Sequence, residues 1–173
     1  MLVKKVLKYI NKNKYISFLI SFYLIFSIST YLIWQIKDHN NLTGDEPHYL
    51  VMANGISKYH TLEQTNPYKE EFKTREIYPP GLNSSDQNPY PSPLNTHAVI
   101  GPNGLFNVHN IGLPLLLALP FKAFGVIGSK AFMILNGLFI VYLIWKILSF
   151  FSSNQYINFL AITPLAISNP LIF

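Results

Sequence analysis

Long apolar stretches alternate with polar segments along this chain. The first stretch covers residues 15–36, where Ser, Thr and Gln are the only polar interruptions. Two more cover residues 129–151 and 156–173, and prolines interrupt the last one. About 20 apolar residues cross a bilayer as a helix, because each residue adds about 1.5 Å. The pattern therefore predicts an all-α membrane protein with about three transmembrane helices.

Basic residues predict the orientation of the first transmembrane helix. Residues 1–14 contain five lysines and no acid, and Lys and Arg are enriched on the cytoplasmic side of membrane helices. We therefore expect residues 1–14 to be cytoplasmic and residues 37–110 to form an extracytoplasmic loop. A cleaved signal peptide is the alternative. Its apolar core is shorter, about 7–15 residues, whereas the first stretch here is longer and ends in the interfacial aromatic pattern of residues 31–34.

The predicted loop opens with signals for a helix. Pro47 suits a first helical turn, where its missing N–H would be unpaired anyway, and Asp45 or Glu46 suits the N-cap. An apolar stripe follows at helical spacing, made of Tyr49, Met52, Ala53 and Ile56. These features predict an amphipathic helix over about residues 46–58 that lies in the membrane interface.

The remainder of the loop is dominated by turn signals. Residues 61–107 contain Asn-Pro, Pro-Pro-Gly and Gly-Pro-Asn-Gly but no long periodic run, so we expect an ordered loop with a binding role. Residues 111–125 are apolar but too short to span, and they predict a second interfacial helix that Gly125 and Gly128 end. The alternative is the first part of a kinked span. Because the chain stops within its third apolar stretch, we expect it to be the N-terminal part of a longer protein.

Composition agrees with a membrane protein and limits its chemistry. Of the 173 residues, 50% are hydrophobic and 12% are charged, and the mean hydropathy is +0.24. The chain has no cysteine, which excludes disulfides and thiolate metal sites. The net charge of +5 includes the N-terminal lysines, which topology explains, so we expect no nucleic-acid partner.

The candidate chemistry lies in residues 44–50, directly after the first predicted span. Adjacent carboxylates at a membrane surface can act as a general base or bind a divalent cation. The simplest alternative is that this acidic pair only caps the helix. A further alternative is a divalent-metal or ion site whose ligands are His39, Asp45, Glu46 and His48.

The order of these features resembles the N-terminal region of the polytopic C-superfamily glycosyltransferases. These enzymes depend on polyprenyl- or dolichyl-phosphate sugars and include relatives of protein O-mannosyltransferases and lipid A aminoarabinose transferases. The resemblance rests on a span, the acidic motif, a helix, a long loop, and the segment from His109 to Gly125. It implies transfer of a sugar from a polyprenyl-phosphate-linked donor to an extracytoplasmic acceptor. Asp45 would be the general base and Glu46 its neighbour in a catalytic pair.

The same resemblance implies a binding site for the anionic lipid phosphate. The candidate substrate-binding residues are Arg75, for a bidentate contact, then Lys69, Lys73 and His109, for added charge, and His48, which would orient the base. Aminoarabinose transferases have a Lys-Pro-Pro-Leu-like stretch where this chain has residues 109–112, so their phosphate-binding lysine has no counterpart here. For Arg75 the alternative is a solvated loop charge, and for His48 it is a surface histidine at a helix start.

The expected partners are membrane lipid, the polyprenyl-phosphate-sugar donor and an acceptor that the sequence does not identify. A divalent cation is a candidate cofactor. The alternative function is a small non-catalytic membrane protein whose extracytoplasmic loop binds a lipid or a protein partner.

Overall fold

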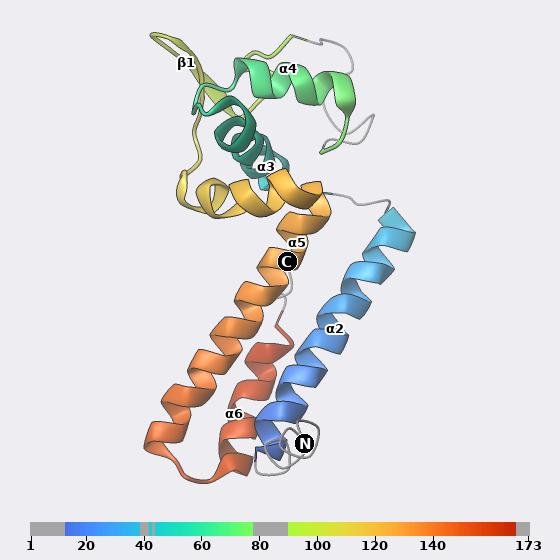
Figure 1. Ribbon diagram of the computed structural model, residues 1–173, viewed down its shortest axis with the longest axis vertical. Helices are drawn as coiled ribbons and strands as arrows, with labels where there is room; N and C mark the ends of the chain where they lie inside the picture. Colours follow the sequence, from blue (N-terminus) through green and yellow to red (C-terminus); the bar gives the residue numbers. More distant parts are fainter. Residues whose placement is uncertain (1–12, 39–41, 43, 78–89, 169–173) are drawn as a thin grey trace, which may run out of the picture. The chain divides into compact units, whose positions relative to one another are not determined.

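The structure, a computed structural model, describes residues 13–38, 42, 44–77 and 90–168. These residues are mostly helical, as the sequence predicts (Figure 1). They divide into two compact units. The first unit holds the described residues up to Asp38 and those from Met133 onward, and the second holds the described residues between them.

Three helices form the first unit. They are α2 (Lys14–Asp38), the later part of α5 (Gly112–Phe151) and α6 (Gln155–Ala166). Their shared core is made of apolar side chains: Ile16, Leu19, Tyr23, Val141, Trp145, Ile162 and Ala166. The Tyr23 hydroxyl donates a hydrogen bond to the Ile134 carbonyl at 3.0 Å. At the start of α6, the Asn154 side chain accepts from two backbone N–H groups, which is how a good N-cap begins a helix.

Among the described residues, two helices are long and apolar enough to cross a membrane. The qualifying stretches are Lys14–Ile33 in α2 and Gly112–Phe151 in α5. In an apolar 18-residue window of each stretch, only 22% and 17% of the residues are buried inside the structure, whereas the core helix of a soluble protein is mostly buried. Large apolar side chains such as Phe18 and Ile25 are exposed instead. This exposure supports a membrane location for both helices.

The third predicted span is shorter in the structure than in the sequence prediction. Helix α6 covers Gln155–Ala166, and twelve residues reach only about 18 Å at 1.5 Å each, less than the membrane core. The last five residues of the predicted span, 169–173, lie outside the described residues. A third crossing therefore stays a prediction.

The second unit combines short helices with a hairpin. Its elements are α3 (Glu46–Asn54), the π-helical turn η1 (Gly55–Tyr59), α4 (Thr65–Thr74), β1 (Ala98–Gly101), β2 (Gly104–Asn107) and the first part of α5. The prediction of a loop dominated by turns over residues 61–107 is wrong for α4 and for the hairpin. The sequence pattern did not predict helix α4, because this charged segment contains only one apolar repeat, Tyr68 and Phe72.

Helix α3 begins where the sequence predicts but is not amphipathic. Its hydrophobic side chains Leu50, Val51, Met52 and Ala53 are all buried, and they point in successive directions around the helix. A helix that is apolar on most sides is a core helix. The predicted single stripe is therefore wrong, because it omitted Leu50 and Val51. The position of α3 in a membrane interface stays a prediction.

Helix α5 has a kink at the glycine where the sequence predicts a break. Phe124 (φ −141°, ψ 15°) and Gly125 (φ 61°, ψ −144°) leave the helical region. A positive φ suits glycine, which has no Cβ to clash. Gly128 stays helical, and a Cβ there would lie 2.8 Å from the Phe124 Cβ. The chain can therefore pack closely at this bend only because Gly128 has no side chain.

The Glu63 side chain helps to fasten the hairpin to the start of α4, beside a backbone hydrogen bond from the Gln64 N–H to the Leu105 carbonyl at 2.8 Å. Strands β1 and β2 pair antiparallel, with Ala98 opposite Asn107. Glu63 accepts hydrogen bonds from the Leu105 N–H at 3.0 Å, the Thr65 N–H at 2.8 Å and the Thr65 hydroxyl. Burial raises the pKa of Glu63, but these hydrogen bonds outweigh burial and hold the pKa below its ordinary value. The carboxylate therefore stays ionised and joins β2 to α4.

Candidate functional site

Asp45 occupies the N-cap position of α3, but its side chain does not cap the helix. Its backbone carbonyl accepts hydrogen bonds from the His48 and Tyr49 N–H groups. Its carboxylate makes no capping hydrogen bond to α3 and is 53% exposed. The interpretation that this acid serves only to cap a helix is therefore wrong. The carboxylate is available for another partner.

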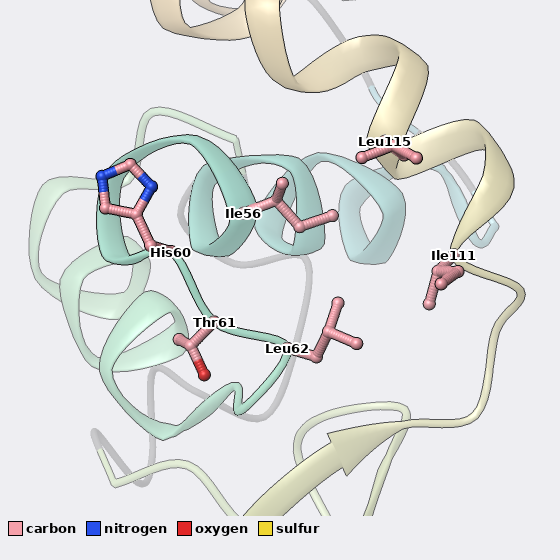
Figure 2. Close-up of a pocket in the computed structure, with 6 residues that line it drawn as sticks. All are labelled: Ile56, His60, Thr61, Leu62, Ile111 and Leu115. Atoms are coloured by element: carbon pink, nitrogen blue, oxygen red, sulfur yellow. The ribbon is translucent and has the colours of Figure 1, made fainter.

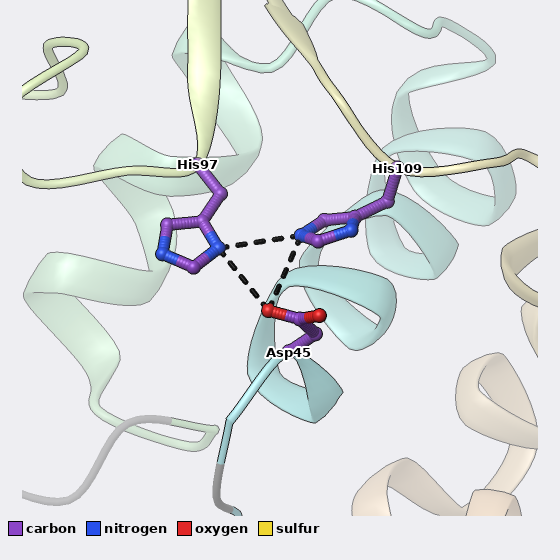
Figure 3. A group of neighbouring side chains, drawn as sticks. All are labelled: Asp45, His97 and His109. Carbon is purple, nitrogen blue, oxygen red and sulfur yellow. Dashed lines mark hydrogen bonds and ion pairs between the residues drawn. The ribbon is translucent and has the colours of Figure 1, made fainter.

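That partner is a pair of histidines from the hairpin. Figure 3 shows the imidazoles of His97 and His109 pointing toward one oxygen of Asp45. The Asp45 Oδ1 atom lies 3.3 Å from His97 Nδ1 and 3.6 Å from His109 Nε2. The two ring nitrogens lie 3.3 Å from each other. Three polar atoms from two separate segments therefore meet at one point, which is the candidate site.

Strand register brings the two histidines together. His97 directly precedes β1, and His109 follows β2 by two residues. The Val108 N–H donates to the His97 carbonyl at 3.0 Å, which extends the ladder beyond the strands. A turn before His97 is also well ordered, since the Asn95 side chain accepts from the Ser92 N–H and donates to the Tyr90 carbonyl. The backbone on both sides of the site is thus fixed by hydrogen bonds.

A partly buried hydrogen-bond network supports the site. The Asn107 Oδ1 atom accepts from the His109 N–H at 3.0 Å, so the Asn107 amide nitrogen faces the Tyr68 hydroxyl at 3.3 Å. The Tyr68 hydroxyl lies 2.6 Å from His48 Nδ1. Donation from Asn107 to Tyr68 and from Tyr68 to His48 gives each atom a compatible role. The network fixes His109 relative to α3 and α4.

His48 is a buried member of this site, and the alternative of a surface histidine is wrong. Its side chain is 6% exposed. Its ring stacks on that of His97, with centroids 3.8 Å apart. Burial, then repulsion from His97 and His109, lowers the pKa of His48 to about 4, although Asp45 acts in the opposite direction. His48 is therefore neutral near pH 7, and its role in substrate binding stays a prediction.

Stability should fall in acid because His48 resists protonation when folded. The unfolded chain takes up the proton near the ordinary pKa of 6.5, and the folded chain does so only near 4. Stability from the neutral ring is therefore complete above pH 6.5 and lost as the pH falls toward 4, by about 3 kcal/mol. Thermal unfolding of the chelator-treated protein in detergent should show this slope, and His48→Gln should flatten it. If the slope of stability against pH is unchanged in that variant, other titrating groups cause it. His60→Asn is the matched control.

The remaining predicted residues lie elsewhere in the second unit. Glu46 begins α3 and interacts electrostatically with Lys130 of α5. Lys69 and Lys73 lie exposed on α4, and Arg75 follows α4 with its guanidinium over the Phe72 ring. Of the predicted site residues, Asp45 and His109 lie together as an ion pair in the structure. Catalysis by Glu46 and phosphate binding by the three cations stay predictions.

The metal site suggested by the sequence differs from the group in the structure. The sequence suggested His39, Asp45, Glu46 and His48, and His39 lies outside the described residues. Among the described residues, Asp45, His97 and His109 form the group whose geometry could hold an ion. His97 was missed. The sequence did contain a signal for it: one histidine lies a few residues before the Gly-Pro-Asn-Gly turn, and another lies a few residues after it. A hairpin built on that turn places both histidines at the same end.

An apolar cavity lies in the same unit. It has a volume of about 340 Å³ and is lined by Ile56, His60, Thr61, Leu62, Ile111 and Leu115 (Figure 2). Four of these six side chains are aliphatic. One of its lining residues, Ile111, follows His109 of the site by two residues in the sequence. It is therefore a candidate place for an apolar part of a ligand.

No protein-family model, curated protein or solved structure matches this chain.

Proposed function

We propose that the chain supplies the general base, Asp45, of a membrane glycosyltransferase. The sugar comes from a polyprenyl-phosphate-linked donor and goes to an acceptor on the extracytoplasmic side, with the N-terminus in the cytoplasm. The observation that carries the proposal is that the Asp45 carboxylate is half-exposed and makes no capping hydrogen bond to α3. An acid of this kind is free to take a proton from a ligand.

The surroundings of Asp45 suit such a reaction. The acceptor hydroxyl gives its proton to the carboxylate as its oxygen attacks the anomeric carbon, and the lipid phosphate leaves with the electron pair of the broken bond. His97 and His109 fix the carboxylate through Oδ1. The two apolar helices supply a membrane anchor, and the aliphatic cavity offers room for part of an isoprenoid chain. Arg75, Lys69 and Lys73 remain candidates for the phosphate.

The test is consumption of the donor by membranes that contain the full-length protein. Radiolabelled polyprenyl-phosphate hexoses and pentoses are supplied one at a time, and free polyprenyl phosphate and labelled product are separated by chromatography. We expect release of polyprenyl phosphate with at least one sugar, and none from membranes without the chain. Equal release from both membranes with every sugar would contradict the proposal and favour the non-catalytic alternative.

A further inference from the structure

We propose that Asp45, His97 and His109 bind a divalent transition-metal ion of the zinc class. One carboxylate oxygen and two imidazole nitrogens converge, with separations of 3.3, 3.3 and 3.6 Å (Figure 3). The three atoms come from the start of α3 and from both ends of the hairpin. This binding does not depend on the glycosyltransferase reaction.

The separations match those around a tetrahedral zinc ion. Zinc binds imidazole nitrogen at about 2.0–2.1 Å and carboxylate oxygen at about 2.0–2.2 Å. Tetrahedral angles then place neighbouring ligand atoms about 3.3–3.5 Å apart. The two shorter separations fall in that range, and the third exceeds it by about 0.1 Å. An ion can therefore bind with little movement of the three side chains.

Hydrogen bonds alone do not satisfy all three contacts of this group at once. If both facing ring nitrogens carry protons, both can donate to the carboxylate oxygen, but no hydrogen bond then joins the two nitrogens. If one nitrogen lacks its proton, its lone pair faces the carboxylate oxygen, which repels it. A cation at the centre replaces the protons and attracts all three lone pairs at once. The geometry thus favours an ion over a purely hydrogen-bonded group.

The ligand types select the class of ion. Two imidazoles with one carboxylate suit zinc and other first-row transition metals, whereas magnesium and calcium prefer sites made of oxygen. Three protein ligands leave the fourth position open, as in catalytic rather than structural zinc sites. Asp45 and His97 are each 53% exposed, so an ion can enter from solvent. His109 is only 13% exposed and anchors the site.

The outer contacts hold the ligands in place. The His109 backbone is fixed by Asn107, and the His97 ring lies against His48. Metal ligands commonly have such a supporting layer, which sets ring orientation. The ion contacts Asp45 through Oδ1, and Oδ2 keeps a lone pair. If the proposed reaction also holds, the open position is where the acceptor hydroxyl binds, beside that second oxygen.

The test is metal binding by the full chain in detergent after removal of metals with a chelator. Zinc is titrated in competition with a chromophoric chelator, and cobalt is titrated while its visible absorption is recorded. We expect one ion per chain and the strong absorption of four-coordinate cobalt. His97→Ala, His109→Ala and Asp45→Asn should each weaken binding by about 100-fold or more, beyond the 10–100-fold effect of supporting residues. His60→Asn removes another imidazole of the same unit and should bind as the wild type does.

A measurement on the wild-type chain tests the proposal without relying on variants that fail to fold. Zinc should protect His97 and His109, but not His60, from carbethoxylation of their rings, as read by peptide mass spectrometry. Binding should also weaken below about pH 6, where histidines protonate. Failure of the wild type to bind zinc or cobalt, or equal modification of all three histidines with and without zinc, would overturn the proposal. No sugar donor is present, so the result is separate from the transfer assay.

Discussion

Asp45→Asn is expected to slow sugar transfer by about 10²–10⁴-fold, the usual worth of a positioned general base. The amide keeps the size of the carboxylate and its position at the start of α3, but it does not accept the acceptor's proton. Helix α3 should persist, because the Asp45 side chain makes no capping hydrogen bond that the change would remove. The measurement is the initial rate of polyprenyl-phosphate release at saturating donor.

The control for this variant is Glu76→Gln, which removes an exposed acid from the same unit and should leave the rate unchanged. A second comparison separates a base from a metal ligand. The rate of Asp45→Asn is measured without zinc and with zinc in large excess. If excess zinc restored the wild-type rate, Asp45 would act only by holding the ion. A wild-type rate without added zinc would remove Asp45 from the mechanism altogether.

The sequence predicted best the long apolar helices. The apolar run of residues 15–36 corresponds to α2, which begins at Lys14 and ends at Asp38. Such runs are easy to recognise because a helix surrounded by lipid is apolar on every side. The bend at Gly125 was also predictable, since that conformation has a positive φ and favours glycine. Both signals are local in sequence.

The candidate site was only partly predictable because it depends on contacts between distant residues. The carboxylate of Asp45 was found from its local context. His97 lies more than 50 residues further on, and only the packing of the hairpin in the second unit brings it to Asp45. The burial of His48 could not be predicted, because it depends on Tyr68 of α4, a helix that sequence periodicity did not reveal. Sequence patterns report local periodicity, and these contacts are not local.

The adjacency of the two acids in the sequence also did not predict which of them contacts the histidines. Asp45 and Glu46 are neighbours and were treated as a pair. In the structure, Asp45 contacts the two histidines, whereas Glu46 interacts with Lys130 of a different helix. Adjacent side chains at a helix start point in different directions. The chemistry of the site therefore rests on Asp45 and on the hairpin that brings the histidines to it.

Gly104→Ala is expected to lower the free energy of unfolding by about 3 kcal/mol or more and to abolish the proposed metal binding. Gly104 has a φ of +130°, which L side chains rarely adopt. A Cβ there would lie 2.7 Å from Glu63 Cγ and 2.8 Å from Cδ, closer than real Cβ atoms approach. The glutamate would have to move and release Leu105 and Thr65. The hairpin would then no longer hold His97 and His109 at their present distances from Asp45.

Thermal unfolding and zinc titration of the same preparation measure both effects. Gly112→Ala is the matched control, because a Cβ at that position meets nothing within 4 Å. It should change the unfolding free energy by less than about 1 kcal/mol and leave zinc affinity intact. The clash also predicts that the two positions are coupled. The double variant Gly104→Ala with Glu63→Ala should lose less unfolding free energy than the two single variants lose together. Additive costs, or wild-type stability in Gly104→Ala, would show that Glu63 does not fasten the hairpin to α4.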